Sequence, residues 1–171
     1  SMDLKEIDNL VLIIGKTEGH IDQSLFARTI LDEKNGPPPE VNLFNEKNNG
    51  ESILNLIDKG YVKSAHDISL GGLLVAISKM CIKGNKGIKI SKSKNLVNEI
   101  EYFFAEDQGR YLIEVNKDDL KEVTKILNKN SVHHEELGII TQNDMIINEK
   151  TKVTIDELKS YYTNWLTKYM S

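Results

Sequence analysis

The hydrophobic residues of this chain follow two spacings, one typical of strands and one typical of helices. Leu10–Ile14 is an unbroken apolar run that stops at Gly15, which predicts a buried strand. Shorter runs predict strands at 61–65, 88–90, 110–115, 132–141 and 144–147, the last two as a pair with a turn at 142–143. Because strands and helices are mixed along the chain, the pattern predicts an α+β or α/β fold.

Helical spacing predicts helices at 24–31, 42–59, 95–104 and 117–128, another that begins at Gly72, and a last one in the tail. The helix from Gly72 is the clearest, because its apolar residues fall on one face. These residues are Leu73, Ala76, Ile77, Met80 and Cys81. In the helix at 24–31 we expect Leu25, Phe26 and Ile30 to face inward, and in the helix at 42–59 the apolar residues are Ile53, Leu54, Leu56 and Ile57.

Two further local signals divide the chain. The run Gly36–Pro39 must interrupt regular structure, since proline fixes φ and restricts the residue before it, and we expect a rigid loop within one domain. Near the end, Thr154 and Glu157 have the spacing of a capping box at the start of an unusually aromatic helix.

Composition narrows the class of protein. The 171 residues are enough for one domain, with 39% hydrophobic and 28% charged residues. A net charge of −4 with interspersed basic residues argues against nucleic acid as a partner, and no apolar run is long enough to span a membrane. The single cysteine, Cys81, excludes an internal disulfide, and its place on an apolar helix face predicts a buried, inert thiol. A cytoplasmic protein is therefore expected.

The first two residues suggest how the chain was made. A serine before a methionine is not a natural translation start, so we expect Ser1-Met2 to be a cleavage scar. Residues 3–171 are then expected to form a single domain that is part of a longer protein.

The most informative segment joins a strand, a carboxylate, a glycine turn and a helix between residues 64 and 81. Ser69, Gly71 and Gly72 stand where the free N–H groups of a helix start can hold a phosphate, and Asp67 can reach a magnesium ion. The alternative is that Asp67 or Ser69 caps the helix, and the two roles are compatible. His66 and Asp67 are neighbours on a strand and should face opposite sides, so no catalytic dyad is expected between them.

Other polar groups are weaker candidates. Glu106, Asp107 and Gln108 precede a strand and can bind a metal or the polar edge of a substrate, or they form a solvated turn with Gly109. His20 follows a glycine-containing loop and can contact a phosphate, or its position is incidental. The run at 133–136, two histidines followed by two glutamates, resembles a metal cluster, but adjacent residues on a strand diverge and a structural role is favoured. The chain contains no self-contained catalytic set, so no catalytic residue is assigned.

Taken in order, several segments resemble the C-terminal domain of the aminoimidazole ribonucleotide synthetase superfamily. The resemblance is strongest to the second such domain in the phosphoribosylformylglycinamidine synthase family. The segments are IIGKTEGHIDQS (13–24), the Gly-Pro-Pro-Pro loop, AHDISLGGLLVAISKM (65–80), FFAEDQGRYLIEV (103–115) and TIDELKSYYTNWLTKYM (154–170). The resemblance covers nearly the whole chain and implies an α+β domain with a mixed β-sheet and helices packed on one face.

The resemblance also implies a function. Enzymes of that family use ATP and Mg²⁺ to convert formylglycinamide ribonucleotide and glutamine-derived ammonia into the amidine. In the matching slots, Asp67 would bind the metal and Glu106, Asp107 and Gln108 the substrate. By pseudo-symmetry these residues line an auxiliary nucleotide site or a vestigial one, and Leu70 stands where relatives often have an acid. The implied partners are the missing N-terminal domains, a glutaminase subunit and a small accessory subunit.

The implied catalytic groups belong to domains outside this chain, so we expect the chain alone to be inactive. A second hypothesis is a non-catalytic scaffold domain, whose aromatic last helix and apolar first strand pack against sister domains. A third is a domain of another superfamily member, such as a selenophosphate synthetase, thiamine monophosphate kinase or hydrogenase maturation protein.

Overall fold

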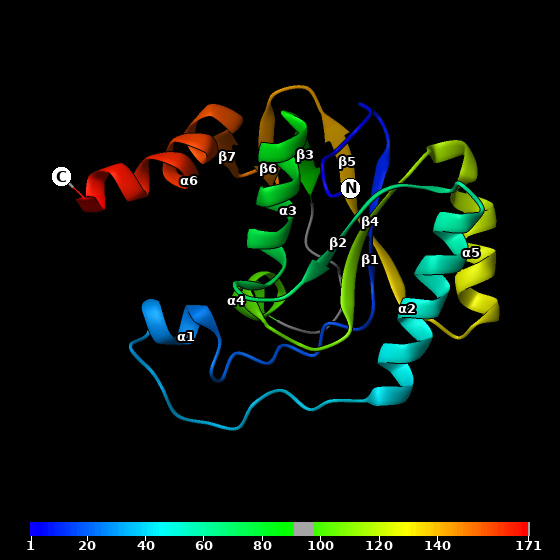
Figure 1. Ribbon diagram of the computed structural model, residues 1–171, viewed down its shortest axis with the longest axis horizontal. Coiled ribbons are helices and arrows are strands. Elements are labelled where there is room, and N and C mark those ends of the chain that lie inside the picture. Colours follow the sequence, from blue (N-terminus) through cyan, green and yellow to red (C-terminus); the bar gives the residue numbers. More distant parts are fainter. Residues whose placement is uncertain (91–97, 171) are drawn as a thin grey trace.

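A mixed β-sheet forms the centre of the molecule (Figure 1). The computed structural model describes residues 1–90 and 98–170, with the backbone alone at 165–168. Within these residues the strand order is β2-β4-β1-β5-β3-β6-β7, and all neighbours are antiparallel except β3 and β6. The strands are β1 Leu10–Ile14, β2 Val62–Ile68, β3 Gly87–Ile90, β4 Arg110–Val115, β5 His134–Thr141, β6 Asp144–Ile147 and β7 Thr151–Thr154.

The helices lie close to where the sequence predicts them. They are α1 Leu25–Thr29, α2 Leu43–Asp58, α3 Gly72–Gly84, α4 Glu99–Phe104, α5 Leu120–Lys129 and α6 Ile155–Met170, with a 3₁₀ turn at Lys117–Asp119. Side-chain oxygens of Ser24, Asn42 and Asn98 cap the first, second and fourth helices. The capping box at Thr154 and Glu157 is confirmed. The first part of the predicted helix at 95–104, residues 95–97, lies outside the described residues.

The sheet has an apolar core on each face. In β1, Val11 and Ile13 face one core with Leu73 and Ile77 of α3. Leu12 and Ile14 face the other, with Ile53 and Leu56 of α2 and Val123 and Leu127 of α5. The α+β class and the mixed sheet are confirmed, but helices cover both faces and not one. The physical reason is visible in β1, because a strand that is apolar at every position has two faces to bury.

The predicted pairing of the two strands after residue 132 is wrong in one respect. β5 and β6 are not neighbours, because β3 lies between them. β3 pairs antiparallel with β5 and parallel with β6. Gly87, at the start of β3, lies so close to the backbone of Asp144 that a Cβ would collide with it. A glycine at this position therefore lets β6 leave β5 and lie along the far side of β3.

Several apolar side chains that were expected to be inside are exposed. Ile30 is 68% exposed and Leu54 is 61% exposed, whereas the predicted inward face of α3 is confirmed. Residues 11–14 of β1 are fully buried within the domain, so this strand has no surface to offer a sister domain. The helix α6 projects from the body in Figure 1, and its exposed large side chains include Tyr161, Tyr162, Tyr169 and Met170.

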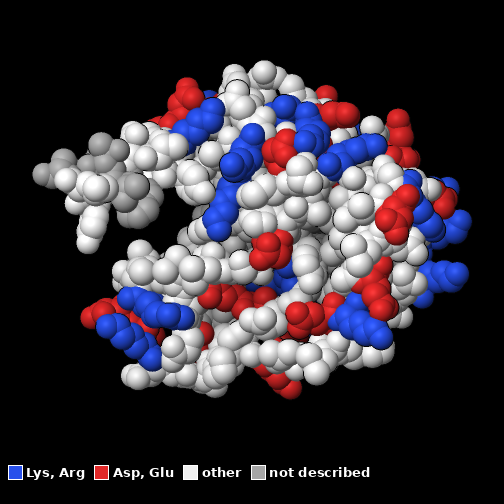
Figure 2. All heavy atoms as spheres, in the orientation of Figure 1, with Lys and Arg blue, Asp and Glu red and all other residues white. Residues whose placement is uncertain are grey.

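Charge and hydropathy on the surface agree with the composition. On the face shown in Figure 2, basic and acidic side chains are interspersed. None of the helices in the described part of the chain has the length and apolar character needed to cross a membrane.

Candidate functional site

Three turns meet at one edge of the sheet, and together they contain the residues that the sequence singles out. β1 ends at Ile14, opposite Tyr111, and β2 ends at Ile68, opposite Arg110. The carboxyl ends of β1 and β2 therefore flank the beginning of β4. The loop at 15–20, the turn at 69–72 and the turn at 105–110, which we call the Asp107 turn, are brought together by this pairing.

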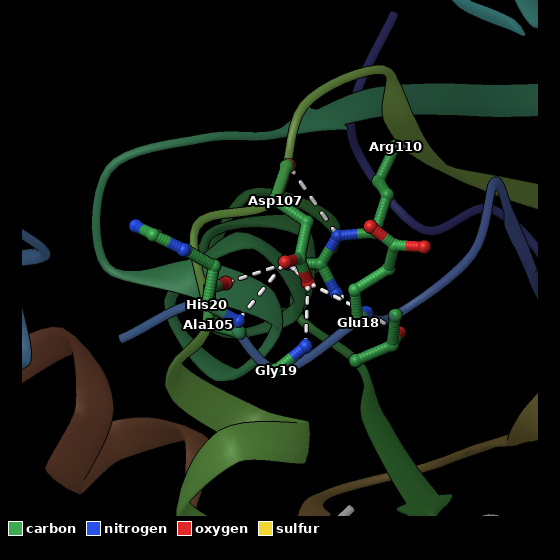
Figure 3. Close-up of polar contacts among 7 residues, drawn as sticks. Glu18, Gly19, His20, Ala105, Asp107 and Arg110 are labelled. Carbon is green, nitrogen blue, oxygen red and sulfur yellow. Dashed lines mark hydrogen bonds and ion pairs between the residues drawn. The ribbon is translucent and has the colours of Figure 1, made fainter. Parts of the chain in front are cut away.

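The Asp107 carboxylate accepts hydrogen bonds from three consecutive backbone N–H groups (Figure 3). One oxygen accepts from Glu18 at 3.1 Å and Gly19 at 3.3 Å, and the other accepts from His20 at 3.0 Å. Three convergent N–H groups form the kind of concavity that binds anions elsewhere in proteins. Here the anion is an internal side chain, only 7% exposed, which fixes the loop after β1.

Arg110 lies beneath this carboxylate and is almost completely buried. Its Nη2 is 3.7 Å from the Asp107 carboxylate and donates to the Ala105 carbonyl at 2.5 Å, while Nη1 donates to Thr17 Oγ1 at 3.0 Å. Burial lowers the pKa of the Arg110 guanidinium, and the negative charge of Asp107 opposes that effect. The buried pair therefore joins the loop after β1 to the start of β4.

Glu106 makes a second internal connection of the same kind. Its Oε1 accepts from the N–H of Leu25 at 2.7 Å and from the N–H of Gly71 at 2.8 Å. The N–H of Gly72 donates to the Ser69 carbonyl at 2.9 Å. Both glycine N–H groups at the start of α3 are thus used within the chain. A phosphate at this turn stays a prediction, and it requires Glu106 to release Gly71.

The second glycine of the turn has a packing role. A Cβ at Gly72 would lie 2.7 Å from the Phe104 carbonyl carbon and 2.8 Å from the Ala105 oxygen, and its φ is +71°. A side chain at this position would meet backbone and not a flexible group. The double glycine that suggested a phosphate site therefore also lets α3 approach the Asp107 turn.

Asp67 differs from Asp107, because its side chain is 59% exposed. Burial opposes its ionisation, but hydrogen bonds from Ser69 and from its own backbone, together with His66, hold the pKa of the carboxyl below its usual value. His66 Nδ1 lies 3.1 Å from the Asp67 carboxylate, so the expectation that the two side chains diverge is wrong. The His66 Nε2 atom is buried and has no hydrogen-bond partner within the described residues.

The metal prediction finds little support in the surroundings of Asp67. Across residues 1–90 and 98–170, no three histidine, cysteine or acidic side chains are grouped so that they could hold a metal ion. Asp67 offers one carboxylate, and Mg²⁺ bound by a single carboxylate needs phosphate oxygens and water for the rest of its shell. This chain therefore does not form a magnesium site by itself.

A polar pocket of about 600 Å³ opens beside the Asp107 turn. It is lined by Lys16, Glu18, His20, Glu46, Asp107 and Gln108, among others, while Asp67, Ser69, Gly71 and Gly72 do not line it. The predicted residues thus form two groups, one at the pocket and one at the start of α3. His20 bonds the Pro37 carbonyl through Nε2 at 3.0 Å, Gln108 is exposed, and Glu106 connects the two groups.

Sequence reasoning missed Arg110 and the α2 side of the pocket. Arg110 begins a strand whose other residues are mostly buried, and an arginine in that place after two carboxylates was an available signal for a buried ion pair. Glu46 and Asn49 come from α2, far away in sequence, and nothing local pointed to them. Cys81 behaves as predicted: it is fully buried, and burial raises the pKa of its thiol to about 12.

Comparison with known proteins decides the family. Residues 6–148 match the family described as AIR synthase related protein, C-terminal domain. The chain belongs to this family. Phosphoribosylformylglycinamidine synthase subunit PurL from Pelagibacter ubique is 66% identical over 170 residues, which are 99% of this chain and 23% of that protein. The resemblance noted in the sequence is thereby confirmed, and the chain spans about a quarter of the length of the curated relatives it matches.

Solved structures of the family share the fold. Thermotoga maritima PurL complexed with FGAR matches with a TM-score of 0.74 at 19% identity, over 91% of this chain and 28% of that chain. The same protein complexed with ATP matches with a TM-score of 0.69 at 17% identity, over 91% of this chain and 26% of that chain. At these identities the likeness shows that the AIR synthase C-terminal fold is common to them.

Proposed function

We propose that the chain is a C-terminal domain of a phosphoribosylformylglycinamidine synthase synthetase subunit. The longer protein converts formylglycinamide ribonucleotide, ATP and glutamine-derived ammonia into formylglycinamidine ribonucleotide in purine synthesis. The observation that supports this most is the 66% identity to PurL over 170 residues. A domain of a selenophosphate synthetase, thiamine monophosphate kinase or hydrogenase maturation protein has no support of that strength.

Within that enzyme, the contribution of this domain is rigid positioning. Asp107 and Arg110 hold the loop at 15–20 in one shape, and Glu106 fixes the start of α3 against α1. ATP and Mg²⁺ supply the activation of the substrate oxygen in the longer protein. At most, Asp67 supplies one metal-binding carboxylate and Gln108 one exposed amide to a ligand that neighbouring domains complete. The proposed partners are those domains, a glutaminase subunit and a small accessory subunit, in the cytoplasm.

A chimera tests this proposal. The matching quarter of the Pelagibacter ubique subunit is replaced by residues 3–171, and ATP-dependent amidine formation is measured with ammonium as the nitrogen source. We expect turnover comparable to that of the unmodified subunit, and none from the 171-residue chain alone. A chimera that folds, as judged by its circular dichroism and melting curve, but is inactive would contradict the proposal. Turnover by the isolated chain would refute the predicted inactivity.

The second candidate is a purely structural domain that binds no nucleotide. The observation that favours it is the use of Glu106 and Asp107 as internal anions, which leaves the N–H groups of 18–20 and of Gly71 already paired. Calorimetry of the chimera with Mg²⁺ and ADP separates the candidates. Loss of one binding event in Asp67→Ala favours a nucleotide site at this turn, and unchanged binding favours the structural role.

A further inference from the structure

A long stretch of this domain lies on its surface without a core of its own. Residues 28–45, which we call the outer segment, run from the end of α1 through the proline loop into the first turn of α2, and every residue except Pro39 is exposed (Figure 1). Its large apolar side chains are Ile30, Leu31, Val41, Leu43 and Phe44. Leu43 and Phe44 are 75% and 77% exposed, the values expected of charged residues.

Exposure on this scale is unusual for a finished surface. Single exposed apolar residues are ordinary, but a group of five within one segment marks an interaction surface. Connections longer than about 12–15 residues without regular structure are uncommon in compact domains and are mostly functional. The apolar residues also occupy the two ends of the segment, while its acidic residues Asp32 and Glu33 stand between them.

The outer segment is nevertheless held in one shape from behind. Gln23 Nε2 donates to the Lys34 carbonyl at 2.8 Å and to the Gly36 carbonyl at 3.1 Å, and His20 Nε2 bonds the Pro37 carbonyl at 3.0 Å. The backbone N–H of His20 is in turn fixed by Asp107. The polar contacts thus point toward the domain and the apolar side chains point away. This arrangement presents a surface that needs little ordering when it binds.

We propose that the outer segment is the docking surface for the part of the longer family polypeptide that lies outside these 171 residues. Relatives of this chain have more than three quarters of their length outside the matched region, so such polypeptide is available in the same molecule. Two small apolar patches bind weakly to a free partner, but a tethered partner has a high effective concentration. A second copy or a separate subunit lacks that advantage.

The pocket supports the same choice. Pro39, Glu40, Asn42 and Asn45 of the outer segment line one side of it, and the Asp107 turn lines another. A domain seated on Val41, Leu43 and Phe44 would close over this polar pocket. Ligand sites are found preferentially at such interfaces between domains.

Hydrogen exchange tests the proposal without relying on enzyme activity. The isolated 171-residue chain and the full-length chimera are compared, peptide by peptide, over residues 28–45. We expect exchange of this segment to be at least about tenfold slower in the chimera, because a covered segment must open before it exchanges. Equal exchange in the two proteins overturns the proposal. An inactive chimera that still protects the segment refutes the proposed function alone.

A pair of variants on one helix makes the test specific. Phe44→Asp introduces a charge into the first turn of α2, where an acidic side chain is tolerated, so the isolated chain should still fold. Leu54→Asp is the control, because Leu54 is 61% exposed on the same helix but outside the segment. We expect Phe44→Asp to abolish the slow exchange in the chimera and Leu54→Asp to preserve it. Loss of protection in both variants contradicts the proposal.

Other occupants give different results. Protection that rises with concentration in the isolated chain, together with a dimer in sedimentation, identifies a second copy. Protection in the chimera that appears only when a glutaminase or accessory subunit is added identifies a separate subunit. Either outcome overturns the proposed occupant.

Discussion

The Asp107 turn and the turn around Asp67 contain the same type of side chain at the same edge of the sheet, yet they are built differently. Asp107 is buried, accepts from three backbone N–H groups and lies over Arg110. Asp67 is largely exposed and contacts His66 and Ser69. The first carboxylate is used to hold the chain together, and the second remains accessible. A carboxylate becomes structural where N–H groups converge and water is excluded, because it then satisfies donors that would otherwise be unpaired.

The largest expected effect breaks the buried side of this comparison. Arg110→Ala removes the guanidinium that joins Asp107, Ala105 and Thr17, and we expect the free energy of unfolding to fall by about 3 kcal/mol. Urea unfolding followed by circular dichroism measures it. Lys125→Ala is the control, because its pair with Glu122 is exposed and is worth less than about 1 kcal/mol. A loss in Arg110→Ala as small as that of the control would show that the pair does not hold the turn.

The close approach of α3 to the Asp107 turn gives the next largest effect. Gly72→Ala places a Cβ against the Phe104 and Ala105 backbone at a positive φ, and we expect a loss of about 2 kcal/mol or more. Gly50→Ala is the matched control in the interior of α2, where a Cβ meets nothing within 4 Å and should stabilise by about 0.5–1 kcal/mol. Thermal unfolding of both variants gives the two signs, and equal signs would contradict the packing role of Gly72.

The connection made by Glu106 should be weaker. Glu106→Gln keeps an acceptor for the N–H groups of Leu25 and Gly71 but removes its charge, so we expect a loss of about 1 kcal/mol. Asp67→Asn, on the exposed side, should change the unfolding free energy by less than about 0.5 kcal/mol. Urea titrations of both variants test the order. An Asp67→Asn variant that loses more stability than Glu106→Gln would reverse the comparison.

The smallest effect concerns the ionisation of Asp67. Hydrogen bonding from Ser69 favours the charged carboxylate, so Ser69→Ala should raise the Asp67 pKa toward its ordinary value of 3.8. Since the folded pKa lies below the unfolded one, Asp67 contributes stability above pH 3.8 and loses it as the pH falls through its folded pKa. The chemical shift of the Asp67 carboxyl carbon, followed against pH in both proteins, measures the change. A pKa that does not move means that Ser69 has no part in it.

Much of the fold could be predicted because its signals are local. The apolar run of β1, the one-sided apolar face of α3 and the cap at Thr154 each depend on residues close together in sequence. The position of β3 between β5 and β6 could not be predicted, since hydropathy does not specify which strands pair. The exposure of Ile30 and Leu54 was missed for a related reason, because apolar spacing alone does not tell which faces the rest of the domain covers.

For the candidate site, the sequence by itself determined which residues have the chemistry and which family they belong to. Asp67, Glu106, Asp107 and the two glycines were all identified from residue type and spacing. Only the tertiary structure decided what each carboxylate does. Strand pairing brings the N–H groups of 18–20 to Asp107 and those of Leu25 and Gly71 to Glu106, across separations of 35 to 89 residues. Such contacts depend on the register of the sheet and the burial it imposes, which no local pattern encodes.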